Sequence, residues 1–102
     1  MTYEAKSLTI AVDYDGTYSA DPDTFTKVIE LFLQAGHTVI CVTGRSADGV
    51  MDVPVRESIG KLIPCIFAGK EWKIVAARDA GYKVDIWIDD IPGMIYPTFG
   101  IQ

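Results

Sequence analysis

Apolar residues run almost without interruption from residue 8 to residue 12, and an aspartate follows at once. A strand that is apolar at nearly every position is typical of the centre of a parallel sheet, where helices cover both faces. Three further short apolar runs have the length and the β-branched content of strands. We therefore predict four strands, at residues 8–13, 37–43, 64–68 and 84–88.

Helical spacing of apolar residues appears between these runs. Apolar positions recur at helical period from Phe25 to Leu33, which predicts an amphipathic helix. Asp21 is suited to cap its N-terminus, Pro22 to occupy the first helical position, and Gly36 to end it. Further helical turns are predicted at about 55–62, after an irregular segment over 46–56, and at about 71–80. The tail, 91–102, is expected to add a short edge strand at 95–96 or 98–101.

Strands and helices therefore alternate along the chain, which is typical of an α/β domain with right-handed crossovers between parallel strands. We predict a three-layer Rossmann-like fold around a central parallel sheet, with residues 1–102 forming one domain. The sequence shows no internal repeat, low-complexity tract or linker that would divide the chain.

Polar residues capable of chemistry follow the first, second and fourth predicted strands. Asp13 and Asp15 are two positions apart, so their side chains leave the same face of an extended backbone. Thr43-Gly44-Arg45 follows the second strand, and Asp89-Asp90 follows the fourth. In an open α/β sheet, ligands bind at the carboxyl ends of the strands. These groups converge if the fourth strand lies beside the first, opposite the second.

The order of these residues resembles the four motifs of the haloacid dehalogenase (HAD) superfamily. The first motif is Asp13-Tyr14-Asp15-Gly16-Thr17, the second is Thr43-Gly44-Arg45, and the fourth is Asp89-Asp90, with a lysine near the start of a helix between the last two. The resemblance covers residues 8 to 93. It implies an HAD-like fold and a Mg²⁺-dependent phosphomonoester hydrolase that acts through an aspartyl-phosphate.

The resemblance also implies the role of each first-motif residue. Asp13 would be the nucleophile that attacks phosphorus and a Mg²⁺ ligand. Asp15 would be the general acid that protonates the leaving oxygen and later activates water, and its backbone carbonyl would bind the metal. A bridging magnesium ion removes the repulsion between a carboxylate and a phosphate dianion.

The other three motifs would bind phosphate and metal. Thr43 would donate a hydrogen bond to the phosphoryl group, and Gly44 and Arg45 would bind the substrate phosphate. Lys73 would neutralise charge on the phosphoryl group and the nucleophile, with Lys70 as the alternative. Asp89 and Asp90 would hold Mg²⁺, directly or through water.

Superfamily members often carry a cap domain after the first motif or after the third strand. Here residues 18–21 alone separate Thr17 from the first predicted helix, and about two or three residues follow the third strand. A capless site is open, which suits a phosphate on a large substrate or a partner subunit that serves as a lid.

Two alternatives differ from an enzyme of this type. The first is a non-catalytic or regulatory module that binds Mg²⁺ and phosphate. The second is a receiver domain, which places adjacent acidic residues after its first strand and its phosphorylated aspartate after its third. Asp13 and Asp15 are not adjacent and no aspartate follows the third predicted strand, which argues against the receiver domain.

Composition restricts partners and location. The 102 residues carry a net charge of −5, and the nine Lys and Arg residues are scattered, which argues against a broad nucleic-acid footprint. No apolar run approaches the length of a membrane span, and the polar start of the chain is unlike a signal peptide. Cys41 and Cys65 lie in apolar strands and are expected to be free thiols, which indicates a reducing cytoplasm. Trp72 and Trp87 are expected to be packing residues. The oligomeric state is not indicated.

Overall fold

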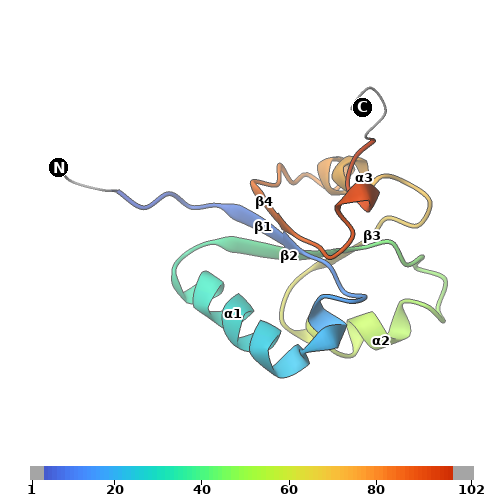
Figure 1. Cartoon of the computed structure of the whole chain (residues 1–102), viewed down its shortest axis with the longest axis horizontal. Coiled ribbons are helices and arrows are strands. Elements are labelled where there is room, and N and C mark those ends of the chain that lie inside the picture. The colour runs from blue at the N-terminus through green and yellow to red at the C-terminus, as the bar shows by residue number, and fades with distance from the viewer. Residues whose placement is uncertain (1–3, 98–102) are drawn as a thin grey trace.

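Four parallel strands form one sheet in a computed structural model that describes residues 4–97 (Figure 1). The strands are β1 (Thr9–Val12), β2 (Thr38–Thr43), β3 (Cys65–Phe67) and β4 (Ile86–Ile88), and their order in the sheet is β3-β2-β1-β4. All three neighbouring pairs are parallel. The four predicted strands and the placement of the last beside the first are confirmed.

Helices lie on both sides of this sheet. Helix α1 (Pro22–Gln34) and the short α2 (Val53–Arg56) lie below it as drawn in Figure 1, and α3 (Lys73–Asp79) lies above. Three 3₁₀ turns, Tyr18–Ala20, Ile59–Lys61 and Pro92–Met94, fall in the connections. The α/β class with a parallel sheet is therefore confirmed, and its architecture is compatible with a Rossmann-like fold.

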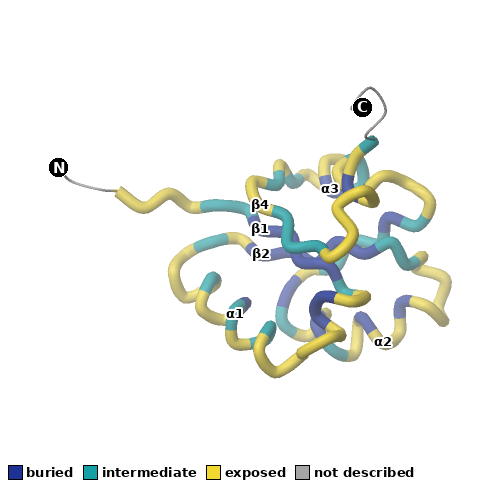
Figure 2. Tube along the Cα trace, viewed as in Figure 1, coloured by how far each residue is buried: buried dark blue, intermediate teal, exposed yellow. Residues whose placement is uncertain are grey.

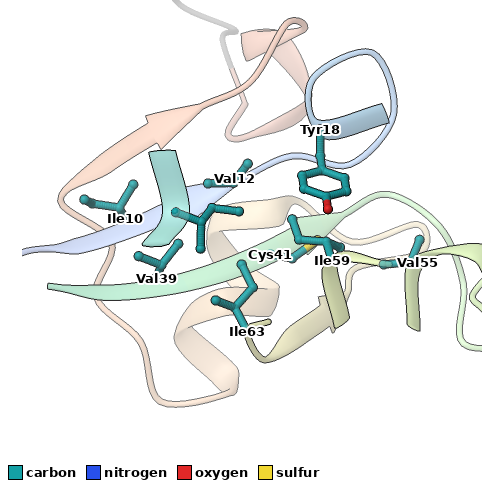
Figure 3. Packing of buried hydrophobic residues seen from close by; sticks show 9 residues of the cluster. Ile10, Val12, Tyr18, Val39, Cys41, Val55, Ile59 and Ile63 are labelled. Carbon is teal, nitrogen blue, oxygen red and sulfur yellow. The ribbon is translucent and has the colours of Figure 1, made fainter. Parts of the chain in front are cut away.

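The two faces of the sheet bury two separate groups of side chains because neighbouring strand residues point to opposite faces. The larger group packs under α1 and α2 and includes the side chains labelled in Figure 3, among them Ile10, Val12, Val39 and Cys41. The smaller group joins Ala11, Ile40 and Val42 to Ala77 of α3. Figure 2 shows the resulting buried stripe along β1 and β2. Burial on both faces explains why the predicted central strand carries no polar alternation.

Helix α1 begins and ends where the sequence predicts. The Asp21 side chain accepts a hydrogen bond from the Thr24 N–H at 3.2 Å, and Pro22 is the first helical residue. Gly36, just beyond the end, has φ +89°, a backbone conformation that favours glycine.

The chain differs from prediction in two places. The helix expected over 55–62 is α2 followed by a separate 3₁₀ turn, and the Ser58 hydroxyl bonds back to the Pro54 carbonyl at 2.6 Å between them. Such a bond competes with continued helix. The edge strand expected at 95–96 is wrong, because these residues continue a turn that Pro92 begins; the alternative at 98–101 lies outside the described residues.

Four residues that the sequence placed in strands or packing can be compared directly with the structure. Cys41 and Cys65 face each other across β2 and β3 and are both free thiols, Cys41 buried and Cys65 half-buried. Trp87 packs against the smaller core group, as expected. Trp72, just before α3, is 39% exposed and belongs to neither core group, so its expected packing role stays a prediction. Among residues 4–97, no helix is both long and apolar enough to cross a membrane.

Candidate active site

The predicted polar groups meet at the carboxyl edge of the sheet because β1 lies between β2 and β4. The Asp13 N–H donates to the Ile88 carbonyl at 2.9 Å, which places the residues after β1 beside those after β4. An open cavity of about 240 Å³ lies at this edge. Its lining contains six of the predicted site residues and three apolar ones: Asp13, Asp15, Gly44, Arg45, Lys73, Asp89, Met51, Ile91 and Met94.

Lys73, the first residue of α3, reaches into the centre of this cluster. Its ammonium lies 2.8 Å from Asp13 Oδ1 and 2.7 Å from Asp89 Oδ2. The side chain is 5% exposed, so both ion pairs are shielded from water. Lys70 is exposed and lines a different hollow beside Trp72. Of the two candidate lysines, the structure therefore brings Lys73 to Asp13.

Three carboxylates gather around this lysine. Oxygen atoms of Asp13, Asp89 and Asp90 all lie within 4.8 Å of one another. Asp13 and Asp89 are buried at their side chains, whereas Asp90 is exposed and lines a neighbouring hollow. When all four groups are ionised, the three carboxylates and the one ammonium give the cluster a net charge of −2. Without the third carboxylate, the net charge would be −1.

Thr17 and Gly16 fix the position of the exposed carboxylate. The Thr17 hydroxyl lies 3.3 Å from Asp13 Oδ2 and 3.2 Å from Asp90 Oδ1, and it accepts the Asp90 N–H at 3.2 Å. Gly16 has φ +77°, and a Cβ there would overlap the Asp90 carboxylate. A glycine is therefore required both by the turn and by the close approach of Asp90.

Burial and charge shift the pKa values of the two central groups. Burial raises the pKa of Asp13 to about 6, although its hydrogen bond to Lys73 acts in the opposite direction. Burial lowers the pKa of Lys73, but hydrogen bonds to Asp13 and Asp89 outweigh it and leave that pKa above its usual value. Lys73 therefore stays charged, and it does not fully offset the cost of burying the Asp13 carboxylate.

The chemistry of this cluster fits a hard divalent cation. Its donors are carboxylate oxygens, which Mg²⁺ prefers, and they are close enough for one ion to contact several of them. An ion of charge +2 would balance the two net negative charges. Asp13, Asp89 and Asp90 could therefore hold a metal ion, whereas the Asp15 carboxylate lies outside this group and is paired elsewhere.

Asp15 forms a two-pronged ion pair with Arg45. Nε and Nη2 of the guanidinium each lie 2.9 Å from a separate Asp15 oxygen. Nη1 donates to the Met51 carbonyl at 2.7 Å, and the guanidinium stands 5.2 Å from the centre of the Tyr14 ring. This hydrogen bonding lowers the pKa of Asp15, so the carboxyl is held ionised. An ionised carboxylate accepts protons and cannot donate one.

Thr43 and Gly44 directly precede Arg45 in the chain. Thr43 is fully buried at the end of β2, and its hydroxyl oxygen accepts the Arg45 N–H at 3.2 Å. Thr43 is not among the residues that line the cavity. Gly44 lines the cavity floor.

Sequence reasoning missed four neighbours of the site. Thr17 is named in the first motif without a role, yet it contacts two of the acidic residues. The apolar residues Met51, Ile91 and Met94 line the cavity without any periodic pattern that marks them. Only Ile91 could have been suspected from the sequence, because it directly follows the acidic pair at the end of the fourth strand.

Comparisons of this chain with protein-family models, with curated proteins and with solved structures found no match.

Proposed function

We propose that this protein is a Mg²⁺-dependent phosphomonoester hydrolase of the HAD type that acts through an aspartyl-phosphate on Asp13. One observation carries the proposal. The Asp13 carboxylate lies at the carboxyl end of the central strand, opens on a cavity, and shares a lysine with Asp89. Acidic groups from β1 and β4 are thus within reach of one cation.

The arrangement of helices supports the same proposal at the level of the fold. Helices α1 and α2 lie on one face of the sheet and α3 on the other, an arrangement compatible with the three-layer HAD-like domain that we propose. The connection after β1 holds one 3₁₀ turn before α1, and residues 68–72 form the connection between β3 and α3. Neither of these described connections contains a cap, in keeping with a small capless member.

The proposed reaction has two steps. An Asp13 oxygen attacks phosphorus, the bond to the ester oxygen breaks, and Asp15 gives a proton to the departing alkoxide. Water then attacks the phosphorus of the aspartyl-phosphate, Asp15 takes its proton, and Asp13 and inorganic phosphate are released. Bound Mg²⁺ would supply electrostatic stabilisation of the phosphoryl oxygens. Lys73, 2.8 Å from Asp13, would stabilise the same negative charge.

Arg45 controls whether Asp15 can act as an acid in this scheme. Paired with Arg45, Asp15 is ionised. A substrate phosphate that takes over the guanidinium would leave Asp15 without its partner and raise its pKa toward the range an acid needs. Thr43 would donate its hydroxyl proton to the phosphoryl group, and Gly44 would let the phosphate approach the backbone.

The Arg45–Asp15 pair also favours one second candidate. In a non-catalytic module that binds Mg²⁺ and phosphate, Asp15 would remain paired and only the acidic cluster would be used. Such a module would bind the metal and phosphate without turnover.

Hydrolysis of p-nitrophenyl phosphate separates the two candidates. We expect turnover with Mg²⁺, loss of turnover with EDTA, and recovery when Mg²⁺ is added back. Asp13→Asn should abolish turnover, whereas Asp23→Asn, the same change at an exposed residue of α1, should have no effect. Magnesium binding without turnover would favour the non-catalytic module. Turnover that survives Asp13→Asn would exclude Asp13 as the nucleophile.

A further inference from the structure

Three of the residues that line the cavity are apolar, although Asp13 and Asp89 of the acidic cluster line it too. These three are Met51, Ile91 and Met94, which we call the apolar rim. They are 46%, 57% and 48% exposed, which is unusual for three large apolar side chains beside one polar site. Met51 comes from the segment after β2, and the other two come from the segment after β4.

The apolar rim is held in place by contacts on both sides of the cavity. The Met51 carbonyl accepts a hydrogen bond from Arg45 at 2.7 Å. Ile95, next to Met94, is 3% exposed, and its carbonyl accepts the Ile74 N–H of α3 at 2.9 Å. Figure 1 shows this segment beside α3. The Met94 side chain extends over Gly44, 3.7 Å from where a Cβ on that glycine would lie.

The cavity is larger than a phosphate group requires. Its volume is about 240 Å³. A phosphate with its phosphorus against Asp13 would leave room for the first atoms of the leaving group, and the surface left to contact them is the apolar rim. Met94 also lines a separate hollow, together with Trp72 and Lys70.

The charges around the cavity further restrict the class of substrate. The two cations of the cavity, Lys73 and Arg45, would both serve the phosphate at Asp13 in the proposed function. Among the lining residues described, none other is positively charged, so a second phosphate would have no partner there. The net charge of −5 also repels polyanions.

We infer that the substrate is a phosphomonoester whose leaving alcohol is apolar next to the ester oxygen, and that Met51, Ile91 and Met94 determine this specificity. Sugar phosphates, glycerol phosphates and substrates with a second phosphate are disfavoured. The inference rests on the proposed function, since it places the phosphate of the substrate against Asp13.

A series of n-alkyl phosphates tests this without a change in leaving-group reactivity. Specificity constants, kcat/KM, are measured with Mg²⁺ for ethyl, propyl, butyl and hexyl phosphate and for glycerol 1-phosphate. Each methylene that enters the rim should raise kcat/KM by up to about fourfold, the equivalent of ~0.8 kcal/mol. Propyl phosphate should exceed glycerol 1-phosphate by about tenfold or more, because a hydroxyl loses hydration against an apolar wall.

Variants show whether the rim is responsible. In Met94→Ser, the ratio of kcat/KM for butyl over ethyl phosphate should fall toward one. Val50→Ser is the matched control: Val50 is 76% exposed on the same segment as Met51 but does not line the cavity, so this ratio should be unchanged. Equal kcat/KM along the series, or an unchanged ratio in Met94→Ser, would overturn the inference.

Binding provides a readout that does not require turnover. Calorimetry with Mg²⁺-loaded protein should give a lower Kd for butylphosphonate than for ethylphosphonate. If no phosphate ester is hydrolysed but this preference appears and is lost in Met94→Ser, the apolar specificity stands and the proposed hydrolysis fails. If esters are hydrolysed and neither readout shows a preference, the hydrolysis stands and the specificity is refuted.

Discussion

Removal of the Lys73 ammonium should destabilise the metal-free protein strongly. In Lys73→Met the side chain keeps its length and apolar stem, but Asp13 and Asp89 lose the cation that lies 2.8 and 2.7 Å from them. Because their side chains are 6% and 2% exposed, water cannot replace it. Breaking a buried ion pair from one side costs about 3–5 kcal/mol. For a domain of this size, that lowers Tm by about 12 °C or more.

The loss should depend on pH with a definite sign. Burial already raises the pKa of Asp13 to about 6, from a usual value of 3.8. A carboxyl that binds its proton more tightly in the folded state loses stability as pH rises through this interval. Without Lys73 the folded-state pKa should rise further. The deficit of Lys73→Met against wild type should therefore be smaller at pH 5 than at pH 8.

Urea unfolding with EDTA present measures these differences. Lys70→Met is the control, because Lys70 is exposed and a surface substitution changes stability by only about 0.5 kcal/mol. Adding Asp13→Asn to Lys73→Met should recover part of the loss, since one unpaired carboxylate is removed. A deficit for Lys73→Met no larger than that for Lys70→Met would refute the reasoning, because the carboxylates would then need no cation.

Two further predictions concern the metal and the turn after β1. Mg²⁺ at ten times its Kd should raise the free energy of unfolding by about 1.4 kcal/mol and Tm by roughly 6–11 °C. Scanning calorimetry before and after addition of EDTA measures this change in Tm. An unchanged Tm at saturating millimolar Mg²⁺ would contradict the metal site. Gly16→Ala should cost about 1–2 kcal/mol from backbone strain and also weaken Mg²⁺ binding, because its Cβ overlaps Asp90. Gly36→Ala, also at positive φ but with nothing within 4 Å of its Cβ, should be destabilised by strain alone, so equal Mg²⁺ affinities in the two variants would show that Asp90 does not bind the ion.

The sheet could be predicted because its signal is local. Each strand is a short apolar run, and burial on both faces removes the polar alternation that would otherwise confuse strand with helix. The capped helix α1 was predictable for the same reason, from Asp21 and Pro22 at one end and Gly36 at the other. The region around α2 was not, because the bond from Ser58 to the Pro54 carbonyl competes with helix over a few residues.

The only part of the site that could be predicted is the meeting of residues that directly follow neighbouring strands. Asp13 and Asp89 converge because β1 and β4 are neighbours, which the sequence could suggest but not establish. Asp15 and Arg45 are thirty positions apart in the sequence, and their pairing depends on the directions and lengths of the two side chains. The spacing of residues in the sequence does not predict such a contact. The apolar rim could not be predicted either, because the sequence does not show whether a methionine such as Met94 is exposed or buried. The catalytic roles of these residues remain predictions.

The acidic cluster is difficult to explain as a structural feature alone. A buried ion pair adds little net stability compared with apolar side chains of similar size, so packing gives no reason to place Asp13, Lys73 and Asp89 together. A third carboxylate, Asp90, is then brought within 4.8 Å by the Thr17 hydroxyl and by a glycine whose Cβ would prevent the approach. Together these features hold three carboxylates around one ammonium, which leaves more negative charge than a fold alone would place there. They are consistent with one another if a divalent cation occupies the cluster and a phosphate approaches from the open cavity beside it.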